Sequence, residues 1–371
     1  MIDKEYIRVL YVNGGLLDRG GISTYMINFA RYLKRKGILV DYIVHGDGVG
    51  EKDYIVREMG SNIYHVPIKS KNFIMNFVSI SRIIRNGNYK IVHSHMDAGN
   101  AIVLSIAKLW KVPIRISHSH NTNFLTDNKF KIIINKIFKK IIKANSTNYF
   151  ACSKAASMWL YDNNEATIIN NAIKLDNYYY NSNCRHLIRK KYDLEDKFVI
   201  GHVGRFDYQK NHLFMLNLFF QLVDEIPNAI LMFIGDGLLR KEIEDKSREL
   251  HINDKIIFIG AIDNVNDYYN AMDMFLFPSK FEGLGISLIE AQVNGLNCVV
   301  SNNIPDEAKL SSHVITNSLN NINLWIESIK KINKENKRYI LPYESIKQFD
   351  IFYESDRLAN IYMDLTKNNL V

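Results

Sequence analysis

The sequence predicts an α/β protein made of two Rossmann-like, doubly wound domains in series. Short apolar runs alternate with longer amphipathic ones, which is typical of βα units and a parallel sheet. This alternation stops in a polar stretch at 174–186 and then begins again. The chain has 371 residues, more than one hydrophobic core usually holds. We therefore place an N-terminal domain at 1–178 and a C-terminal domain at 179–349, and we expect a helix at 350–371 to pack back on the first.

The strands and helices follow from local patterns. In the N-terminal domain, apolar runs predict strands at 6–13, 40–45, 91–95, 113–120 and 148–153. In the C-terminal domain, they predict strands at 198–206, 229–237, 256–260, 274–279 and 297–302. Amphipathic segments predict helices between them, such as 238–250 and 21–37, the latter ending at Gly37 after basic residues in its last turn.

Composition excludes several classes of protein. With 47% hydrophobic and 23% charged residues, the chain resembles an ordinary globular protein. It has neither an apolar run of roughly 18 residues nor a recognisable secretory signal, so we expect a cytoplasmic protein. Cys152, Cys184 and Cys298 are far apart and form no C-x-x-C pair, which argues against a disulfide framework or a zinc site.

Charge is distributed unevenly along the chain. Residues 1–180 hold 25 Lys and Arg against 13 Asp and Glu, which leaves 22 against 26 for the remainder of the 47 cations and 39 acids. The two parts therefore carry about +12 and −4. Such asymmetry indicates an anionic partner for the first half, usually nucleic acid or a membrane surface, although solvated lysines without a partner would give the same count.

Unusual residues follow the predicted strands, where open α/β sheets bind their ligands. The first strand is followed by "NGGLLDRGG", and two others end in histidine pairs. In the second domain, "GRFDYQKN" and "FEGLGIS" each follow a strand. Two domains that face each other across these loops would form a cleft.

Two motifs of the second domain suit a diphosphate. Arg205 and Lys210 are five residues apart on a loop, where a guanidinium fork and a point charge can reach one diphosphate, unless both are only solvated cations. In "FEGLGISLIE", glycines at a helix start leave unshielded N–H groups at the positive end of the helix dipole. Ser287 and Glu290 also have the spacing of a capping box, so a structural explanation is open.

The order of these motifs resembles the retaining GT-B glycosyltransferases of glycosyltransferase family four. The resemblance is closest over 198–308 and continues more loosely over 6–153. Its most specific part is the Glu-x7-Glu pattern of Glu282 and Glu290, with "PS" before it and "NG" after it. The resemblance implies the GT-B fold, in which two Rossmann-like domains face each other.

The resemblance also implies roles for single residues of the second domain. It assigns Glu290 to the nucleotide ribose, Glu282 to the donor sugar, and Arg205 with Lys210 to the leaving diphosphate. The remaining donor-binding positions are loop and helix-start residues: Gly204, Gly235, Gly283, Leu284, Gly285, Ile286 and Ser287.

In the first domain, the resemblance implies a Gly-Gly loop and a histidine beside the sugar. Gly20 and Gly21 match the loop, with Gly14 and Gly15 as the weaker match. For the histidine, "SHSHNT" offers His118 and His120, which share one face of a strand and are not distinguished. The pair at 93 and 95 is expected to be structural or on the acceptor side. Four such histidines could form a zinc site, but parallel strand ends gather polar residues in any cleft, so we predict no metal.

Together these observations predict a metal-independent transferase. The chain contains no Asp-x-Asp, so the charge of the leaving group would be stabilised by Arg205, Lys210 and the helix dipole. The donor is expected to be a UDP-sugar, used as substrate with no cofactor, and the acceptor a lipid-linked saccharide of capsule, exopolysaccharide or O-antigen. Retention at the anomeric carbon is implied by the resemblance alone. The alternatives are a UDP-sugar epimerase and a non-catalytic partner subunit.

A basic amphipathic helix predicted at 129–145 bears on the anionic partner. At 100° per residue, an apolar arc lies opposite a lysine face. The arc contains Phe130, Ile133, Ile134, Ile137, Phe138 and Ile141, and the face contains Lys136, Lys139, Lys140 and Lys143. If the arc packs on the sheet, the lysines either remain in water or hold the protein at an anionic membrane, with Ile132 and Ile142 dipping into the interface. We predict peripheral association with the inner face of the membrane and no nucleic acid partner.

Overall fold

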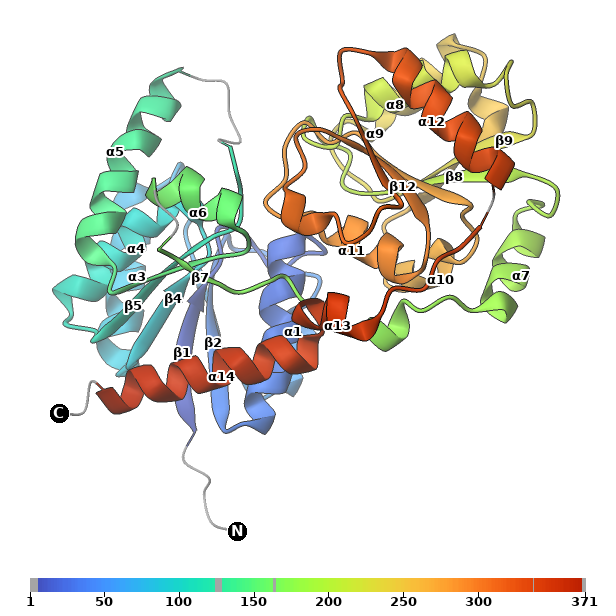
Figure 1. Cartoon of the computed structure of the whole chain (residues 1–371). Coiled ribbons are helices and arrows are strands. Elements are labelled where there is room, and N and C mark those ends of the chain that lie inside the picture. Colours follow the sequence, from blue (N-terminus) through green and yellow to red (C-terminus); the bar gives the residue numbers. More distant parts are fainter. Residues whose placement is uncertain (1–5, 124–128, 163–164, 336, 369–371) are drawn as a thin grey trace. The chain divides into compact units, whose positions relative to one another are not determined.

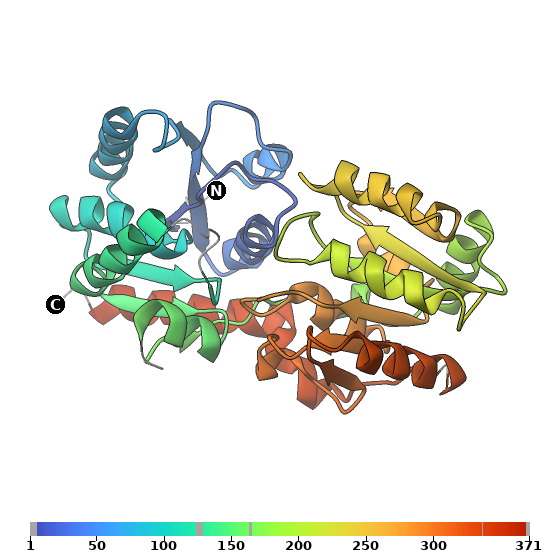
Figure 2. The same ribbon diagram turned by 90° about the horizontal axis from the view of Figure 1, so that it is seen from above.

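A computed structural model describes residues 6–123, 129–162, 165–335 and 337–368. The chain divides into two compact units (Figure 1). One contains Met1–Ile173 and Gln348–Val371, and the other contains Lys174–Lys347. Because the second unit lies within the sequence of the first, the chain returns to the first unit at its C-terminal end. Each unit is a parallel sheet with helices on both faces (Figure 2).

In the first unit, the described strands pair in the order β3-β2-β1-β4-β5-β6-β7, all in parallel. The strands are β1 (Ile7–Val12), β2 (Ile38–His45), β3 (Ile63–Val66), β4 (Ile91–Ser94), β5 (Ile114–Ser119), β6 (Asn148–Ala151) and β7 (Thr167–Ile168). The helices are α1 (Gly21–Arg35), α2 (Asp53–Glu58), α3 (Phe73–Gly87), α4 (Asn100–Leu109), α5 (Lys129–Asn145), α6 (Lys154–Tyr161) and α14 (Ile351–Asn368).

Alternating residues of the central strand β1 enter two cores. Val9 and Tyr11 point to the core that α1 and α14 cover, whereas Leu10 and Val12 point to the core under α3 and α4. All four side chains are fully buried, which explains why the strand is a continuous apolar run in sequence. The last helix, α14, lies along α1 on the same face of the sheet (Figure 1).

In the second unit, the described strands pair in the order β10-β9-β8-β11-β12-β13, again in parallel. The strands are β8 (Phe198–Val203), β9 (Ala229–Ile234), β10 (Ile256–Gly260), β11 (Met274–Phe277), β12 (Asn297–Ser301) and β13 (Val314–Asn317). The helices are α7 (Ser182–Lys191), α8 (His212–Leu222), α9 (Arg240–Glu249), α10 (Val265–Tyr269), α11 (Ile286–Val293), α12 (Ile322–Glu335) and α13 (Tyr343–Ile346).

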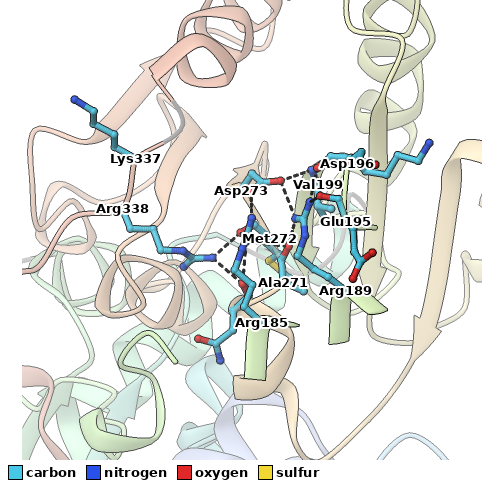
Figure 3. A network of polar contacts seen from close by, with 12 residues as sticks. Arg185, Arg189, Glu195, Asp196, Val199, Ala271, Met272, Asp273, Lys337 and Arg338 are labelled. Carbon is cyan, nitrogen blue, oxygen red and sulfur yellow. Dashed lines mark hydrogen bonds and ion pairs between the residues drawn. The ribbon is translucent and has the colours of Figure 1, made fainter. Parts of the chain in front are cut away.

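A buried ionic network fixes α7 to the start of the strands in this unit (Figure 3). Asp273 accepts bonds from Arg185 at 2.5 Å, from Arg189 at 3.1 Å and from the backbone N–H of Val199 at 2.7 Å. Arg338 donates to carbonyl groups of the same turn. Every carboxylate oxygen therefore has a donor, which a buried charge requires. The network lies at the start of β8 and just before β11, at the edge of the sheet opposite the loops that follow these strands.

The predicted parallel α/β architecture is confirmed, and each predicted strand is present with its ends shifted by a few residues. Sequence reasoning missed β3, β7 and β13, which have two to four residues each. It also interpreted 174–186 as a linker, whereas α7 begins at Ser182 with Asn181 as its cap. Short strands and polar helices carry little periodic signal.

The predicted packing of α5 is wrong. Ile142, placed off the apolar arc, is fully buried, whereas Ile133 and Ile137 on that arc are 57% and 53% exposed. Lys139 does not point into water: its ammonium lies 4.9 Å from the Trp159 ring and donates to the carbonyl of that residue. The sequence fixes the angles between side chains, but the neighbours decide which side of a helix packs. The side chain of residue 130 lies outside the described residues.

Candidate functional site

Three loops gather at one edge of the second sheet. Strands β9, β8 and β11 are neighbours and parallel, so the segments that follow them all leave from the same edge. These segments hold Gly235, Arg205 with Lys210, and Glu282. Helix α11, which carries Glu290, begins directly after the third loop. The structure thus brings together within one unit residues that are up to 85 positions apart, because Arg205 and Glu290 bound the set.

The two glycine loops touch backbone to backbone. Gly235 has φ +139°, and a Cβ there would lie 2.1 Å from the carbonyl oxygen of Gly204. A Cβ on Gly204 would in turn lie 2.8 Å from Nε2 of buried His202. Position 235 therefore requires glycine, since a side chain there would push the two loops apart, whereas a side chain at 204 would displace the buried His202 ring. This fit explains structurally why glycine begins the Gly-Asp-Gly turn at 235–237, and the contact of this turn with a nucleotide stays a prediction.

Lys210 and Glu282 form a buried ion pair. The Nζ of Lys210 donates to Oε1 of Glu282 at 2.6 Å, and Gln209 donates to Oε2 at 3.2 Å. The side chains are only 15% and 7% exposed, and the ammonium also lies 4.9 Å from the Phe277 ring. The ammonium has three donors, so it can bind an anion while it keeps its bond to the carboxylate.

Arg205 is placed differently. Its side chain is 61% exposed, and Nε pairs with Asp207 at 3.2 Å. Asp207 also accepts the backbone N–H of Lys210 at 3.1 Å, so the two residues predicted to bind the diphosphate share one loop. The guanidinium lies in solvent and is not in contact with the Lys210–Glu282 pair. Its role at a diphosphate therefore stays a prediction.

Glu290 is buried and bonded by two tyrosines. Tyr178 donates to Oε1 at 2.8 Å and Tyr269 to Oε2 at 2.7 Å. Burial raises the pKa of Glu290 to about 7, against the opposing effect of the two hydroxyls and Lys210. Each carboxylate oxygen still has a lone pair for a further donor. Sequence reasoning missed both tyrosines, because neither belongs to the local motif.

The start of α11 is suited to an anion. Its N-cap is Gly285, with φ +88° and ψ 68°, and no described side chain caps it. The capping-box explanation is therefore wrong, because the Glu290 carboxylate is turned to the tyrosines and does not cap the helix start. The first N–H groups of the helix have no partner within the helix and can bind an anion. These N–H groups belong to the segment 283–287, which was predicted from the sequence to bind the donor.

In the first unit, Gly20 is the N-cap of α1. The backbone N–H of Gly20 donates to Asp18 at 2.8 Å, and the Ser23 hydroxyl donates to the same oxygen at 2.9 Å. This small network fixes the turn that leads to Gly21. The earlier glycine pair is held instead by Asn13, whose amide donates to the carbonyl of Gly15 at 3.1 Å. Both loops follow β1 at the edge where β4 and β5 also end.

Four buried histidines lie at that edge. His93 and His95 belong to the end of β4, and His118 and His120 to the end of β5. Nε2 of His93 lies 3.0 Å from Nδ1 of His118, and Nδ1 of His95 lies 2.9 Å from Nε2 of His120. Burial lowers the pKa of all four, that of His120 to about 3. They are therefore neutral imidazoles at pH 7.

The geometry of the histidines favours hydrogen bonding over metal ligation. Three of them, His93, His95 and His118, can place one ring nitrogen each within 4.8 Å of the others. However, the rings of His93 and His118 are nearly parallel, at 8°, with centroids 5.1 Å and nitrogens 3.0 Å apart, so the nitrogens point at each other. A zinc ion needs about 2.0–2.1 Å to each nitrogen, with lone pairs that converge on a third point.

His120 is the more accessible of the two candidate histidines. It follows the last residue of β5 and is 6% exposed, whereas His118 lies within the strand and is 0% exposed. Its backbone N–H donates to Asp97 at 2.7 Å, and Asn121 donates to the other carboxylate oxygen at 2.6 Å. Asp97 was missed by sequence reasoning, because its partners lie 23 and 24 residues later.

Comparisons with known proteins match both units. Residues 19–177 match the family model "Glycosyltransferase Family 4", and residues 185–341 match "Glycosyl transferases group 1". The putative glycosyltransferase EpsF of Bacillus subtilis is 30% identical over 335 residues, which cover 87% of each chain. The capsular polysaccharide biosynthesis glycosyltransferase CapH of Staphylococcus aureus is 29% identical and covers 97% of this chain and 99% of its own.

One further relative and one solved structure are similar to the chain at lower sequence identity. An Escherichia coli enzyme named UDP-Gal:alpha-D-GlcNAc-diphosphoundecaprenol alpha-1,3-galactosyltransferase is 23% identical over 90% of this chain and 88% of its own. The crystal structure of Anabaena HepE in complex with UDP-glucose has a TM-score of 0.77 over 97% of this chain and 100% of that chain, at 15% identity. At this identity the structure shows a shared fold alone.

Proposed function

The chain belongs to glycosyltransferase family 4 and is a GT-B glycosyltransferase, and from this premise we propose its specific reaction. It transfers a sugar from a UDP-sugar to a hydroxyl group of a lipid-linked saccharide, with retention and without a metal ion. The bond between the anomeric carbon and the diphosphate breaks, a bond to the acceptor oxygen forms, and the acceptor proton leaves with UDP or through solvent. We place this reaction in the synthesis of a capsular or extracellular polysaccharide.

The observation that carries the proposal is the buried Lys210–Glu282 pair next to the open helix start at Gly285. A leaving diphosphate gains negative charge, and fixed positive groups in a buried site stabilise such charge best. Lys210 supplies a full charge, and the first N–H groups of α11 supply partial ones. Glu290, which accepts hydrogen bonds from two tyrosines, is assigned to the ribose hydroxyls. In the first unit, we assign His120 to the donor sugar, as the family resemblance implies for a histidine after this strand.

The donor and acceptor classes are supported by the named relatives. The Escherichia coli relative is named for a UDP-sugar donor and a diphosphoundecaprenol acceptor, and CapH for capsular polysaccharide. Because nearly the full lengths of these chains align, we assign the same classes of substrate to this protein. Metal independence is supported by the absence of Asp-x-Asp from the sequence and by Lys210 as the alternative source of positive charge.

A lipid-linked acceptor requires access to a membrane, and we assign this access to the surface of α3. None of the described helices is long and apolar enough to span a bilayer. Five large apolar side chains are nevertheless exposed on the first two turns of α3, by 36% to 73%. They are Phe73, Ile74, Met75, Phe77 and Val78. Such a patch on a surface helix marks an interaction site.

Charge around this α3 surface indicates an anionic partner. The segment 59–96, between Glu58 and Asp97, contains five cations and no acid. Arg82 and Arg85 follow the apolar turns on the same helix and line a hollow of about 340 Å³ with Trp110. Apolar side chains beside basic ones suit the interface of an anionic leaflet. We therefore assign membrane contact at the cytoplasmic leaflet to α3 first, with exposed Ile133 and Ile137 of α5 as a smaller second patch.

The test is a transfer assay with purified protein. A panel of nucleotide sugars is offered with and without lipid-linked saccharides, and both UDP release and the anomeric configuration of the product are recorded. We expect UDP release only with acceptor, one preferred UDP-sugar and a product with the donor's anomeric configuration. UDP release without acceptor would indicate epimerase-type chemistry, and UDP binding without any turnover would indicate a partner subunit. Glu290→Ala is the control and is expected to weaken UDP binding.

A further inference from the structure

A continuous chain of hydrogen bonds runs through the core of the first unit to the histidine cluster. The hydroxyls of Tyr11 and Tyr362 lie 3.0 Å apart, and the Tyr362 hydroxyl lies 2.6 Å from Nδ1 of His93. Nε2 of His93 lies 3.0 Å from Nδ1 of His118. All four side chains are fully buried. The chain connects β1, α14, β4 and β5 in one polar path.

Tyr362 holds the central place in this path. It belongs to α14, the helix with which the chain returns to the first unit, and it lies among apolar residues of the core. Its hydroxyl is shared between Tyr11 and His93. The neighbouring Tyr25 and Tyr42 lie in the same core and have no such contact with a histidine nitrogen among the described hydrogen bonds. The last helix therefore brings one polar group to the cluster.

The number of protons on the two imidazoles determines how the Tyr362 hydroxyl acts on them. A neutral imidazole has one N–H, so only one of its nitrogens can donate. If Tyr362 donates to Nδ1 of His93, the His93 proton is on Nε2 and donates to Nδ1 of His118, whose own proton must then be on Nε2. If Tyr362 accepts instead, every bond reverses and Nε2 of His118 is bare. The hydroxyl thus couples the tautomers of two histidines.

The free end of the path is next to the histidine assigned to the sugar. Nε2 of His118 has no hydrogen-bond partner among the described residues, although it is buried. The His118 ring stacks on the His120 ring at 4.1 Å and 17°. The His93 ring stacks on His95 at 4.2 Å in the same way, and His95 bonds His120. The His93–His118 pair therefore stacks on the His95–His120 pair.

We propose that Tyr362 is a positioning residue for the transfer reaction. Its hydroxyl bonds Nδ1 of His93, which couples the tautomers of His93 and His118 and fixes the orientation of their rings, and this pair orients His120 by stacking. The C-terminal helix thereby takes part in the site without touching a substrate. The effect on turnover rests on the proposed function, which places His120 at the donor sugar, whereas the tautomers do not depend on it.

The experiment is Tyr362→Phe in the full chain, which keeps the ring and removes the hydroxyl. Imidazole ¹⁵N chemical shifts, assigned with His93→Asn and His118→Asn, report which nitrogen carries the proton. We expect matched tautomers of His93 and His118 in the wild type and averaged, unmatched shifts for both residues in the variant. Turnover is expected to fall about tenfold, the lower end of what loss of a partner that orients a histidine costs, with KM for the donor within about twofold.

Two matched variants make the result specific. Tyr11→Phe removes the outer link and is expected to have a weaker effect in the same direction. Tyr42→Phe removes another buried hydroxyl, which lies 3.4 Å from the Met26 carbonyl, and should change neither the shifts nor the turnover. Circular dichroism and thermal unfolding confirm that all variants are folded.

Three outcomes would overturn the proposal. The ¹⁵N shifts of His93 and His118 could be unchanged in Tyr362→Phe. The shifts could change while turnover stays at the wild-type rate, or Tyr42→Phe could have the same effect as Tyr362→Phe. Failure of the proposed function gives a different result, because the wild-type protein would then have no transfer activity. Its ¹⁵N shifts would still report whether the tautomers of His93 and His118 are matched.

Discussion

At the scale of single residues, the Lys210–Glu282 pair is expected to contribute both to the stability of the fold and to turnover. Lys210→Ala leaves the Glu282 carboxylate buried without its cation, so we expect the free energy of unfolding to fall by about 3–5 kcal/mol. Turnover should fall by about 10²–10³, as when a donor to a developing negative charge is removed. Lys210→Met combined with Glu282→Gln should recover most of the stability and none of the activity. Urea unfolding and steady-state rates measure both effects, and a stable but inactive single variant would contradict the ion-pair argument.

Arg205 supplies the matched comparison. Its side chain is largely exposed, so Arg205→Ala should change the free energy of unfolding by less than about 0.5 kcal/mol. If the guanidinium contacts the diphosphate only when donor is bound, turnover should still fall. Wild-type turnover in this variant would leave the charge stabilisation to Lys210 and the helix start alone.

The carboxyl group of Glu290 predicts a pH dependence of nucleotide binding. Ribose hydroxyls donate to the ionised form, and the pKa is about 7, so UDP affinity should rise as the pH increases from 6 to 8. The ionised fraction changes about tenfold over this range, which bounds the effect. Calorimetry at several pH values measures it, with Glu290→Gln to subtract the titration of UDP itself. Equal slopes for both proteins would refute the assignment.

The raised pKa of Glu290 also makes the free energy of unfolding depend on pH, and this free energy falls as the pH rises. The protonated carboxyl favours the folded state, because its pKa is about 7 in the fold and about 4.3 in unfolded chains. Its contribution is therefore complete below the unfolded value and is lost as the pH rises through 7. A bound ribose offsets this loss, so ligand should stabilise the protein more at pH 8 than at pH 6.

At the scale of elements, the loops depend on their glycines. Gly285 has a left-handed φ, and a Cβ would lie 3.1 Å from the Phe277 ring. We expect Gly285→Ala to lower the free energy of unfolding by about 1–2 kcal/mol and to weaken donor binding, since α11 would shift. Gly235→Ala should destabilise more, because its Cβ would meet the Gly204 carbonyl. Gly15→Ala is the control, with open space within 4 Å and no left-handed φ; thermal unfolding ranks the three.

The α3 surface predicts salt-sensitive binding to anionic vesicles. Ile74 and Phe73 are 73% and 55% exposed, so Phe73→Glu/Ile74→Glu should abolish sedimentation with phosphatidylglycerol vesicles without unfolding the protein. Ile133→Glu/Ile137→Glu on α5 should have a smaller effect. Added salt and neutral vesicles should both reduce binding. If only the α5 variant loses binding, the membrane surface is misassigned, and if wild type never binds, no membrane surface exists here.

At the scale of the whole molecule, charge stabilisation by the protein predicts indifference to chelators. Lys210 and the start of α11 supply the positive charge that a divalent ion would otherwise provide. Turnover after treatment with EDTA should therefore stay within about twofold of its initial value. Loss of activity that Mn²⁺ or Mg²⁺ restores would show that a metal ion shares the charge of the leaving group.

The sequence by itself determined the parallel α/β architecture, the positions of the longer strands and the grouping of the motif residues. Alternation of apolar runs fixes the elements, and parallel strands bring their C-terminal loops to one edge, so "GRFDYQKN" and "FEGLGIS" meet without further information. A two-residue period likewise placed each histidine pair on one face. Only the tertiary structure decided the partners. The partners depend on packing between segments that are distant in sequence, which local periodicity does not predict. Examples are Tyr178 and Tyr269 at Glu290, Tyr362 at His93, and the buried side of α5.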